Sequence, residues 1–221
     1  MAAISRSQAV IEFDLDGTVL EVNDNFLTLT GYTREEVIGN RHAMFVDEDY
    51  VRTPAYRNFW QKLGAGEFES GEFKRIGKGG REVWIQATYN PILDMSGRPV
   101  KVVKYAIDIT KAKLHNAEFE GKVAAIGRSQ AVIEFGLDGT ILAANENFLG
   151  LLGYRPEEIV GKHHRMFLTP AQAASEGYRN FWRQLGEGQF CSGEYKRIAK
   201  DGTEKWIQAT YNPIFDLDGA R

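Results

Sequence analysis

The sequence predicts an α+β fold that is present twice in the chain. In each half, short runs with strand-like alternation and glycine-containing turns are interspersed with short amphipathic helical segments. The second half repeats the first at a constant offset of 122 residues without a gap, as from Ile4 to Ile126. More than half of the paired positions are identical, so we interpret the halves as two copies of one domain.

Each copy is expected to contain five strands and three helices in the order ββααα-βββ. Asp16-Gly17 forms a hairpin turn between the first two strands. Asn23 or Asp24 caps the first helix, and Thr33-Arg34-Glu35-Glu36 has the form of a capping box for the second. In the first copy the expected strands are 9–15, 18–22, 72–76, 82–89 and 100–109, and the longest helix is 54–63.

A long hairpin over 70–92 is the clearest structural signal in the chain. Gly77-Lys78-Gly79-Gly80 supplies glycines that can take the positive φ of a tight turn. The hairpin returns at 192–214, and the Trp-Ile-Gln-Ala-Thr-Tyr-Asn-Pro segment of its second arm is unchanged.

The repeat predicts the domain boundaries. Domain 1 covers 1–110, a charged segment at 111–126 is expected to form a connecting helix, and domain 2 covers 127–221. The fifth strand of domain 2 would fall after Arg221, so we expect the natural protein to continue beyond it.

The composition excludes several classes of protein. The 221 residues are 43% hydrophobic and 26% charged, as in a globular protein. With a net charge of −3 and acids and bases interspersed, we expect no nucleic-acid partner. No apolar run reaches the length of about 18 residues that spans a membrane, and no signal peptide is apparent. The single Cys191 fits a reducing, cytoplasmic setting.

The order of elements and several short motifs resemble the PAS sensor domain. The motifs are Asn23-Asp24-Asn25-Phe26, Gly31-Tyr32, Glu35-Glu36-Val37-Ile38-Gly39 and Asp108-Ile109-Thr110, and most recur in the second copy. Within the family, Phe59-Trp60 with Ser70-Gly71 is most similar to PAS domains of bacterial aerotaxis and biofilm-dispersion chemoreceptors.

The resemblance implies a five-stranded antiparallel sheet in the order 2-1-5-4-3, with the helices over one face and a small-molecule pocket between. It also implies a methyl-accepting coiled coil after Arg221, which would connect the chain to a downstream chemotaxis signalling domain and kinase complex. Because the absent fifth strand would be central, domain 2 is expected to be frayed or to be completed by another chain.

Candidate pocket residues occur at matching positions in the two copies. The alternation of the hairpin's second arm places three of them on one face, which would form an apolar pocket wall. The candidates are Asn23, His42, Trp60, Ile85, Ala87 and Tyr89 in the first copy, and Asn145, His164, Trp182, Ile207, Ala209 and Tyr211 in the second.

The cofactor stays open between haem, FAD and none. His42 and His164 stand where light-sensing flavin PAS domains have a cysteine, which excludes a flavin-cysteinyl photocycle. A neutral imidazole can bind haem iron, and the competing interpretation is a buried histidine hydrogen-bonded to backbone. FAD-binding relatives have an Arg-His pair where this chain has Val46-Asp47, so a pyrophosphate would lack its basic partners. No metal site is assigned.

One motif resembles that of an enzyme. Asp14-Leu15-Asp16-Gly17-Thr18 matches the signature of haloacid-dehalogenase-like phosphatases, which need both carboxylates. Gly136 replaces the first aspartate in the second copy, whereas Asp138-Gly139-Thr140 is kept. A hairpin turn is therefore favoured, and we expect no catalysis.

The outer sheet face and the linker are candidate contact surfaces. Trp84 and Trp206 alternate with the pocket wall, so they face outward and indicate docking of a helix or a second copy. Arg75 and Arg197 are expected to be solvated strand charges.

These observations together predict the sensory region of a cytoplasmic chemoreceptor, which relays a ligand, gas or redox signal through the linker helix. The alternative is a cofactor-free interaction and dimerisation module. A phosphatase is the third hypothesis.

Overall fold

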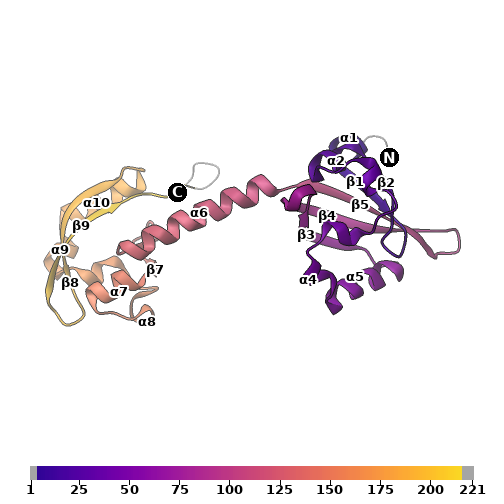
Figure 1. Cartoon of the computed structure of the whole chain (residues 1–221). Helices are drawn as coiled ribbons and strands as arrows, with labels where there is room; N and C mark the ends of the chain where they lie inside the picture. Colours follow the sequence, from indigo (N-terminus) through magenta and orange to yellow (C-terminus); the bar gives the residue numbers. More distant parts are fainter. Residues whose placement is uncertain (1–3, 216–221) are drawn as a thin grey trace. The chain divides into compact units, whose positions relative to one another are not determined.

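The chain divides into two compact units at Glu118 and Phe119. The computed structural model describes residues 4–215 (Figure 1). Both units contain strands and short helices in the same order, as the repeat predicts. The boundary within the connecting helix falls close to the predicted linker.

The first unit is built on one five-stranded antiparallel sheet. Its order is β2-β1-β5-β4-β3, which confirms the predicted topology. The last strand in sequence, β5, is central because it pairs with β1 on one side and β4 on the other. The strands are β1 (Ala9–Phe13), β2 (Val19–Val22), β3 (Glu69–Ile76), β4 (Glu82–Leu93) and β5 (Pro99–Asp108).

Short helices connect β2 to β3 and cover the inner face of the sheet. Helix α5 (Pro54–Gly64) contacts β3, β4 and β5. Its capping residue is Thr53, with a proline at the first helical turn. The other helical segments of this unit are α1 (Ile4–Ser7), α2 (Asp24–Thr30), α3 (Arg34–Val37), α4 (Glu48–Val51) and the 3-10 turns η1 (His42–Phe45) and η2 (Lys78–Gly80).

The caps read from the sequence form where expected. Asn23 caps α2, and Gly31 ends it with a φ of 79°. The Glu36 side chain accepts a hydrogen bond from the Thr33 backbone N–H, as in a capping box. The segment at His42 forms the 3-10 turn η1, and α4 is a short helix beyond the three that the sequence predicts.

The second unit contains the same elements without a central strand. Its strands form two separate pairs, β6–β7 and β8–β9. Within residues 119–215 no strand lies between β6 and β9, and the strand expected after Arg221 lies outside the described residues. The elements are β6 (Ile133–Phe135), β7 (Ile141–Ala144), α7 (Glu146–Leu152), α8 (Pro156–Ile159), η3 (His164–Phe167), α9 (Pro170–Ala174), α10 (Glu176–Gly186), β8 (Cys191–Ile198) and β9 (Glu204–Tyr211).

The open position leaves the interior of the second unit partly exposed. Ile85, Ala87 and Tyr89 on β4 are at most 2% exposed, whereas their counterparts on β9 are only half-buried. A strand that pairs on one side only leaves half of its backbone groups to solvent. The identical hairpin arm therefore has two different environments.

Helix α6 (Thr110–Ser129) connects the strands of the two units. It extends the predicted 111–126 helix by one residue at its start and three at its end. None of its described side chains is buried. No helix in the described part of the chain is both long and apolar enough to cross a membrane.

We predict faster backbone hydrogen exchange in β9 than in β4. Residues 84–92 and 206–214 have the same sequence, so their intrinsic exchange rates are matched. In β4, some of the backbone amides bond to β5. The equivalent amides of β9 have no strand partner in the described second unit, so they should exchange at rates close to those of an open chain. Hydrogen-exchange mass spectrometry of a monomeric sample measures both segments, and equal protection would contradict this account.

Candidate functional site

A buried histidine organises the interior of the first unit. His42, at the start of η1, is 1% exposed. Its Nδ1 lies 3.1 Å from the hydroxyl of Tyr56 on α5, and its Nε2 lies 3.1 Å from the hydroxyl of Tyr89 on β4. Arg75 on β3 donates from Nη2 to the same Tyr89 hydroxyl at 2.8 Å. We call this set Arg75, Tyr89, His42 and Tyr56 the Arg–Tyr–His–Tyr chain.

The charges around His42 determine its protonation. Burial lowers the pKa of His42 well below its usual value, and the positive charges of Arg75 and Lys104 lower it further. The ring is therefore neutral near pH 7, with one donor nitrogen and one acceptor nitrogen.

The hydrogen-bond directions follow from the donors available. Arg75 can only donate, so the Tyr89 oxygen accepts from Arg75 and its proton goes to His42 Nε2. His42 Nδ1–H then donates to the Tyr56 hydroxyl. The Tyr89 hydroxyl and both nitrogens of His42 are thus engaged in one consistent direction, which runs from Arg75 Nη2 to Tyr56.

Aromatic rings enclose the imidazole. The ring centroids lie 5.3 to 6.4 Å from that of His42. Packing of this kind excludes water and strengthens the hydrogen bonds inside it. The rings are those of Phe13, Phe45, Tyr56, Phe59, Trp60 and Tyr89.

The second unit contains the same chain in a looser form. Arg197 Nη2 donates to the Tyr211 hydroxyl at 2.8 Å. The Tyr211 hydroxyl lies 3.4 Å from His164 Nε2, and His164 Nδ1 lies 3.0 Å from the Tyr178 hydroxyl. Burial lowers the pKa of His164 to about 3. The same hydrogen-bonded chain thus occurs in both units, although the described second unit has only two strand pairings where the first has four.

Haem ligation by His42 does not fit this arrangement. Both ring nitrogens of His42 are engaged by tyrosine hydroxyls, and the aromatic rings named above pack around the imidazole. An iron at either nitrogen would have to displace a hydroxyl. The competing interpretation, a hydrogen-bonded structural histidine, fits better, although the partners are tyrosines rather than backbone.

The other predicted pocket residues fall into two groups. Trp60 contacts Phe13 and His42 at the interior, beside the wall of Ile85, Ala87 and Tyr89. Trp182 makes the equivalent contacts with Phe135 and His164, beside half-buried Ile207, Ala209 and Tyr211. The structure therefore brings ten of the twelve predicted residues to the two interiors.

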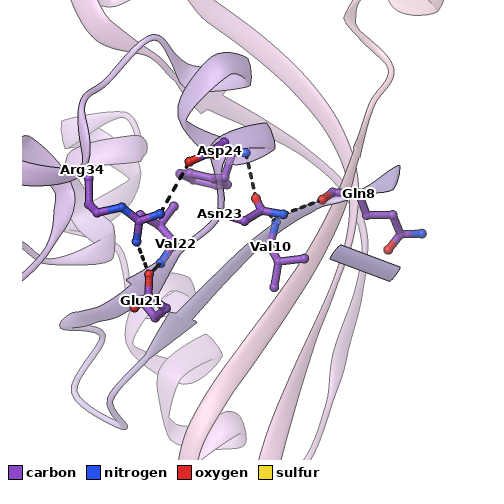
Figure 2. A network of polar contacts seen from close by, with 8 residues as sticks. Gln8, Val10, Glu21, Val22, Asn23, Asp24 and Arg34 are labelled. Carbon is purple, nitrogen blue, oxygen red and sulfur yellow. Dashed lines mark hydrogen bonds and ion pairs between the residues drawn. The ribbon is translucent and has the colours of Figure 1, made fainter. Parts of the chain in front are cut away.

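Asn23 and Asn145 do not join these interiors. Asn23 Oδ1 accepts from the backbone N–H groups of Val10 and Phe26 at 2.9 and 3.0 Å, and its Nδ2 donates to Gln8 O at 2.9 Å (Figure 2). Asn145 repeats this with Val132, Phe148 and Gln130. Each asparagine ties the first strand of its unit to the following helix, which is a structural role.

A shallow groove lies beside Asn23 on the outside of the first unit. Its volume is about 290 Å³, and Arg34 bridges Glu21 and Asp24 across it (Figure 2). All three side chains are exposed to solvent, which screens their charges, so this ion-pair group contributes little to stability.

The expectation that Arg75 and Arg197 are solvated is wrong. They are 6% and 5% exposed, and they donate to the hydroxyls of buried Tyr89 and half-buried Tyr211, respectively. The residue missed entirely is Lys104 on β5, which is 0% exposed. Strand alternation could have indicated that all three side chains face the interior. Arg75 lies on the same strand face as Phe73, and Lys104 lies on the same face as Val102 and Ala106.

The acidic motif forms a turn, as predicted. Asp16 Oδ1 accepts from the Thr18 backbone N–H at 2.9 Å, and Asp16 also pairs with Arg41. Hydrogen bonding by the Thr18 side chain, and next by its backbone N–H, lowers the pKa of Asp16. Within residues 4–215 no group of three or more His, Cys, Asp or Glu is arranged to hold a metal ion.

We predict that Tyr89→Phe destabilises the first unit by about 1–3 kcal/mol, because Arg75 and His42 both lose a buried hydrogen-bond partner. Tyr211→Phe is the matched control, since the half-buried site admits water to the freed groups. Urea denaturation of both variants measures the difference. An equal loss in the two variants would contradict the buried character of the first chain.

We also predict that stability falls as the pH falls from 7 to about 5. The folded pKa values of His42 and His164 lie below the unfolded value of about 6.5, so the unfolded state binds protons first. The slope is at most about 1.4 kcal/mol per pH unit per histidine. Denaturation of a His42→Gln, His164→Gln double variant should show a flatter pH profile; an unchanged profile would rule out the histidines as its source.

A PAS fold family model matches residues 19–106 and 141–221, one match in each unit. The chain is 45% identical over 219 residues to the biofilm dispersion protein BdlA of Pseudomonas aeruginosa, covering 99% of this chain and 52% of that protein. It is 32% identical over 80 residues to the aerotaxis receptor of Escherichia coli, covering 36% and 16% of the two chains. The oxygen sensor protein DosP of E. coli is 24% identical over 196 residues, covering 86% and 24%.

The chain therefore spans about half of BdlA and a smaller share of the other two relatives. The family match covers most of both units, and the sheet order is the one that the resemblance implied. The chain belongs to the PAS fold family, and it is similar to the biofilm dispersion protein over both PAS segments and to the aerotaxis receptor over 80 residues.

Proposed function

We propose that this chain is the sensory module of a cytoplasmic methyl-accepting chemotaxis receptor. In this proposal, a small ligand, gas or redox change acts on the PAS interiors, and helix α6 relays the change. Similarity to BdlA over nearly the whole chain and to the aerotaxis receptor supports a signalling sensor role. A downstream chemotaxis signalling domain and a kinase complex are the proposed partners.

The observation that carries the proposal is a set of contacts between β4 and the start of α6. The Trp84 backbone N–H donates to Thr110 Oγ1 at 2.9 Å, and the Ile109 N–H donates to Trp84 O at 2.9 Å. Lys113 Nζ lies 5.4 Å from the Trp84 ring centroid and pairs with Glu72 on β3. We call these contacts the α6 clamp.

The α6 clamp lies on the opposite face of β4 from the Arg–Tyr–His–Tyr chain. Trp84 and Tyr89 belong to one strand, and their parity places them on opposite faces. Strand β5 also carries the buried Lys104 and continues directly into α6. In this proposal, a change inside the first unit that shifts β4 or β5 acts on the first turn of the helix, and that turn is the proposed two-state element.

The apolar residues of α6 favour a second candidate function, which is dimerisation without a cofactor. Leu114, Phe119, Val123 and Ile126 are 53–65% exposed, and Trp206 on β9 is 69% exposed. Exposed apolar side chains of this size indicate a contact surface. A homodimer through α6 or through the Trp84 and Trp206 sheet faces would cover them.

We predict that the complete receptor containing this chain changes the activity of its kinase between air and anaerobic reduction. Thr110→Val removes the acceptor of the Trp84 N–H, so it should reduce that difference while the chain stays folded. The exposed Thr28→Val on α2 is the matched control. Kinase phosphorylation rates measure the effect, and a rate that is equal in both conditions would reject redox or gas sensing.

Absorption spectroscopy and light scattering of the purified chain separate the two candidate functions. A Soret band or flavin peaks would identify a cofactor-bearing sensor. A colourless dimer that takes up neither cofactor and leaves the kinase unaffected would support the dimerisation module instead.

A further inference from the structure

We propose that the interior of the first unit binds a small carboxylate with an apolar body, and that Lys104 is the residue that pairs with it. The proposal rests on the sensory function above and names the chemical class of its ligand. It is argued from the position of Lys104, its missing partner and the absence of acidic groups around it.

The register of the sheet places Lys104 at the centre of the inner face. On the central strand β5 its cross-strand neighbours are Ile11 of β1 and Tyr89 of β4. All three side chains are 0% exposed. The side chain is too deep for its ammonium group to reach solvent, as lysines on a sheet surface do.

The Lys104 Nζ has no hydrogen-bond partner among the described residues. It lies 5.0 Å from the ring centroid of Tyr89 and 5.3 Å from that of Phe26. Contacts with aromatic faces stabilise a cation only partly, and they do not replace the hydrogen bonds that an ammonium group has in water.

No buried acid compensates for this charge. The buried polar side chains of the described first unit are Thr30, His42, Arg75 and Lys104, and none is acidic. Arg75 adds a second cationic group, and its Nε is also buried without a partner. Two basic groups in one interior without a carboxylate are costly unless a bound anion pairs with them or Lys104 loses its proton.

Binding of the anion therefore changes the protonation of Lys104. Burial and the nearby Arg75 lower the pKa of Lys104 well below its usual value, which favours the neutral amine when no anion is bound. The groups that face it, Arg75, His42 and Tyr89, supply no negative charge. A carboxylate beside Nζ favours the ammonium form, so one proton from solvent is taken up as the anion binds.

The surroundings also select the rest of the ligand. Ile11, Phe26 and Tyr89 offer only apolar surfaces around Nζ. The close packing of the rings restricts the ligand to a few non-hydrogen atoms, and the flexible Lys104 side chain must move to admit it. A short-chain monocarboxylate such as propionate meets these requirements.

The experiment measures the binding of propionate to the purified chain by calorimetry in two buffers of different ionisation enthalpy. We expect saturable binding with proton uptake close to one per site. Lys104→Met keeps the volume and removes the buried charge, so it should fold and lose affinity about tenfold or more. Lys101→Met is the matched control, because Lys101 lies on the same strand in a surface ion pair with Glu12.

Propionamide, the neutral isostere, should not bind to either protein. Equal propionate affinity in Lys104→Met and in the unchanged chain would overturn the proposal, as would binding without proton uptake. Absence of binding for every monocarboxylate from formate to benzoate would overturn it as well. Because these measurements use the chain alone, such failures leave the response of the kinase to air and reduction intact as a separate test of the sensory function.

Discussion

The interior of each unit depends on a neutral histidine that is buried among aromatic rings. A buried imidazole needs one donor and one acceptor, and the two tyrosine hydroxyls supply them from α5 and β4 in the first unit. Arg75 fixes the direction of the whole chain because it can only donate. These hydrogen bonds connect β3, β4, η1 and α5, so one polar network joins these four elements in the interior of the first unit.

The central strand decides how completely that network is enclosed. In the first unit β5 pairs on both sides and closes the inner face, and His42 is 1% exposed beneath it. In the described second unit β9 pairs only with β8, and Tyr211 lies 3.4 Å rather than 3.1 Å from its histidine. Both histidines are 1% exposed, so the difference lies at the tyrosine, which is 0% exposed at Tyr89 and half-buried at Tyr211.

The central strand is also the connection to the outside of the first unit. β5 carries the one buried lysine of the described chain on its inner face and leads into α6, whose first turn is held by Trp84 and Glu72. A sensory domain requires its interior to be linked mechanically to an output element. In the proposed relay this link is short, since β5 carries Lys104 and leads into the helix that the α6 clamp holds.

The sequence by itself determined the two copies, the order of the elements, the caps at Asn23 and Gly31 and the inward row of Ile85, Ala87 and Tyr89. These follow from local propensity and from the two-residue period of strands, which neighbouring residues encode. Only the tertiary structure decided that Arg75 reaches the Tyr89 hydroxyl, that Lys104 Nζ has no hydrogen-bond partner among the described residues, and that Asn23 stays outside the interior. The partners of His42 stand 14 and 47 residues away, so no local pattern could reveal that packing would bring a histidine, two tyrosines and an arginine into one hydrogen-bonded chain.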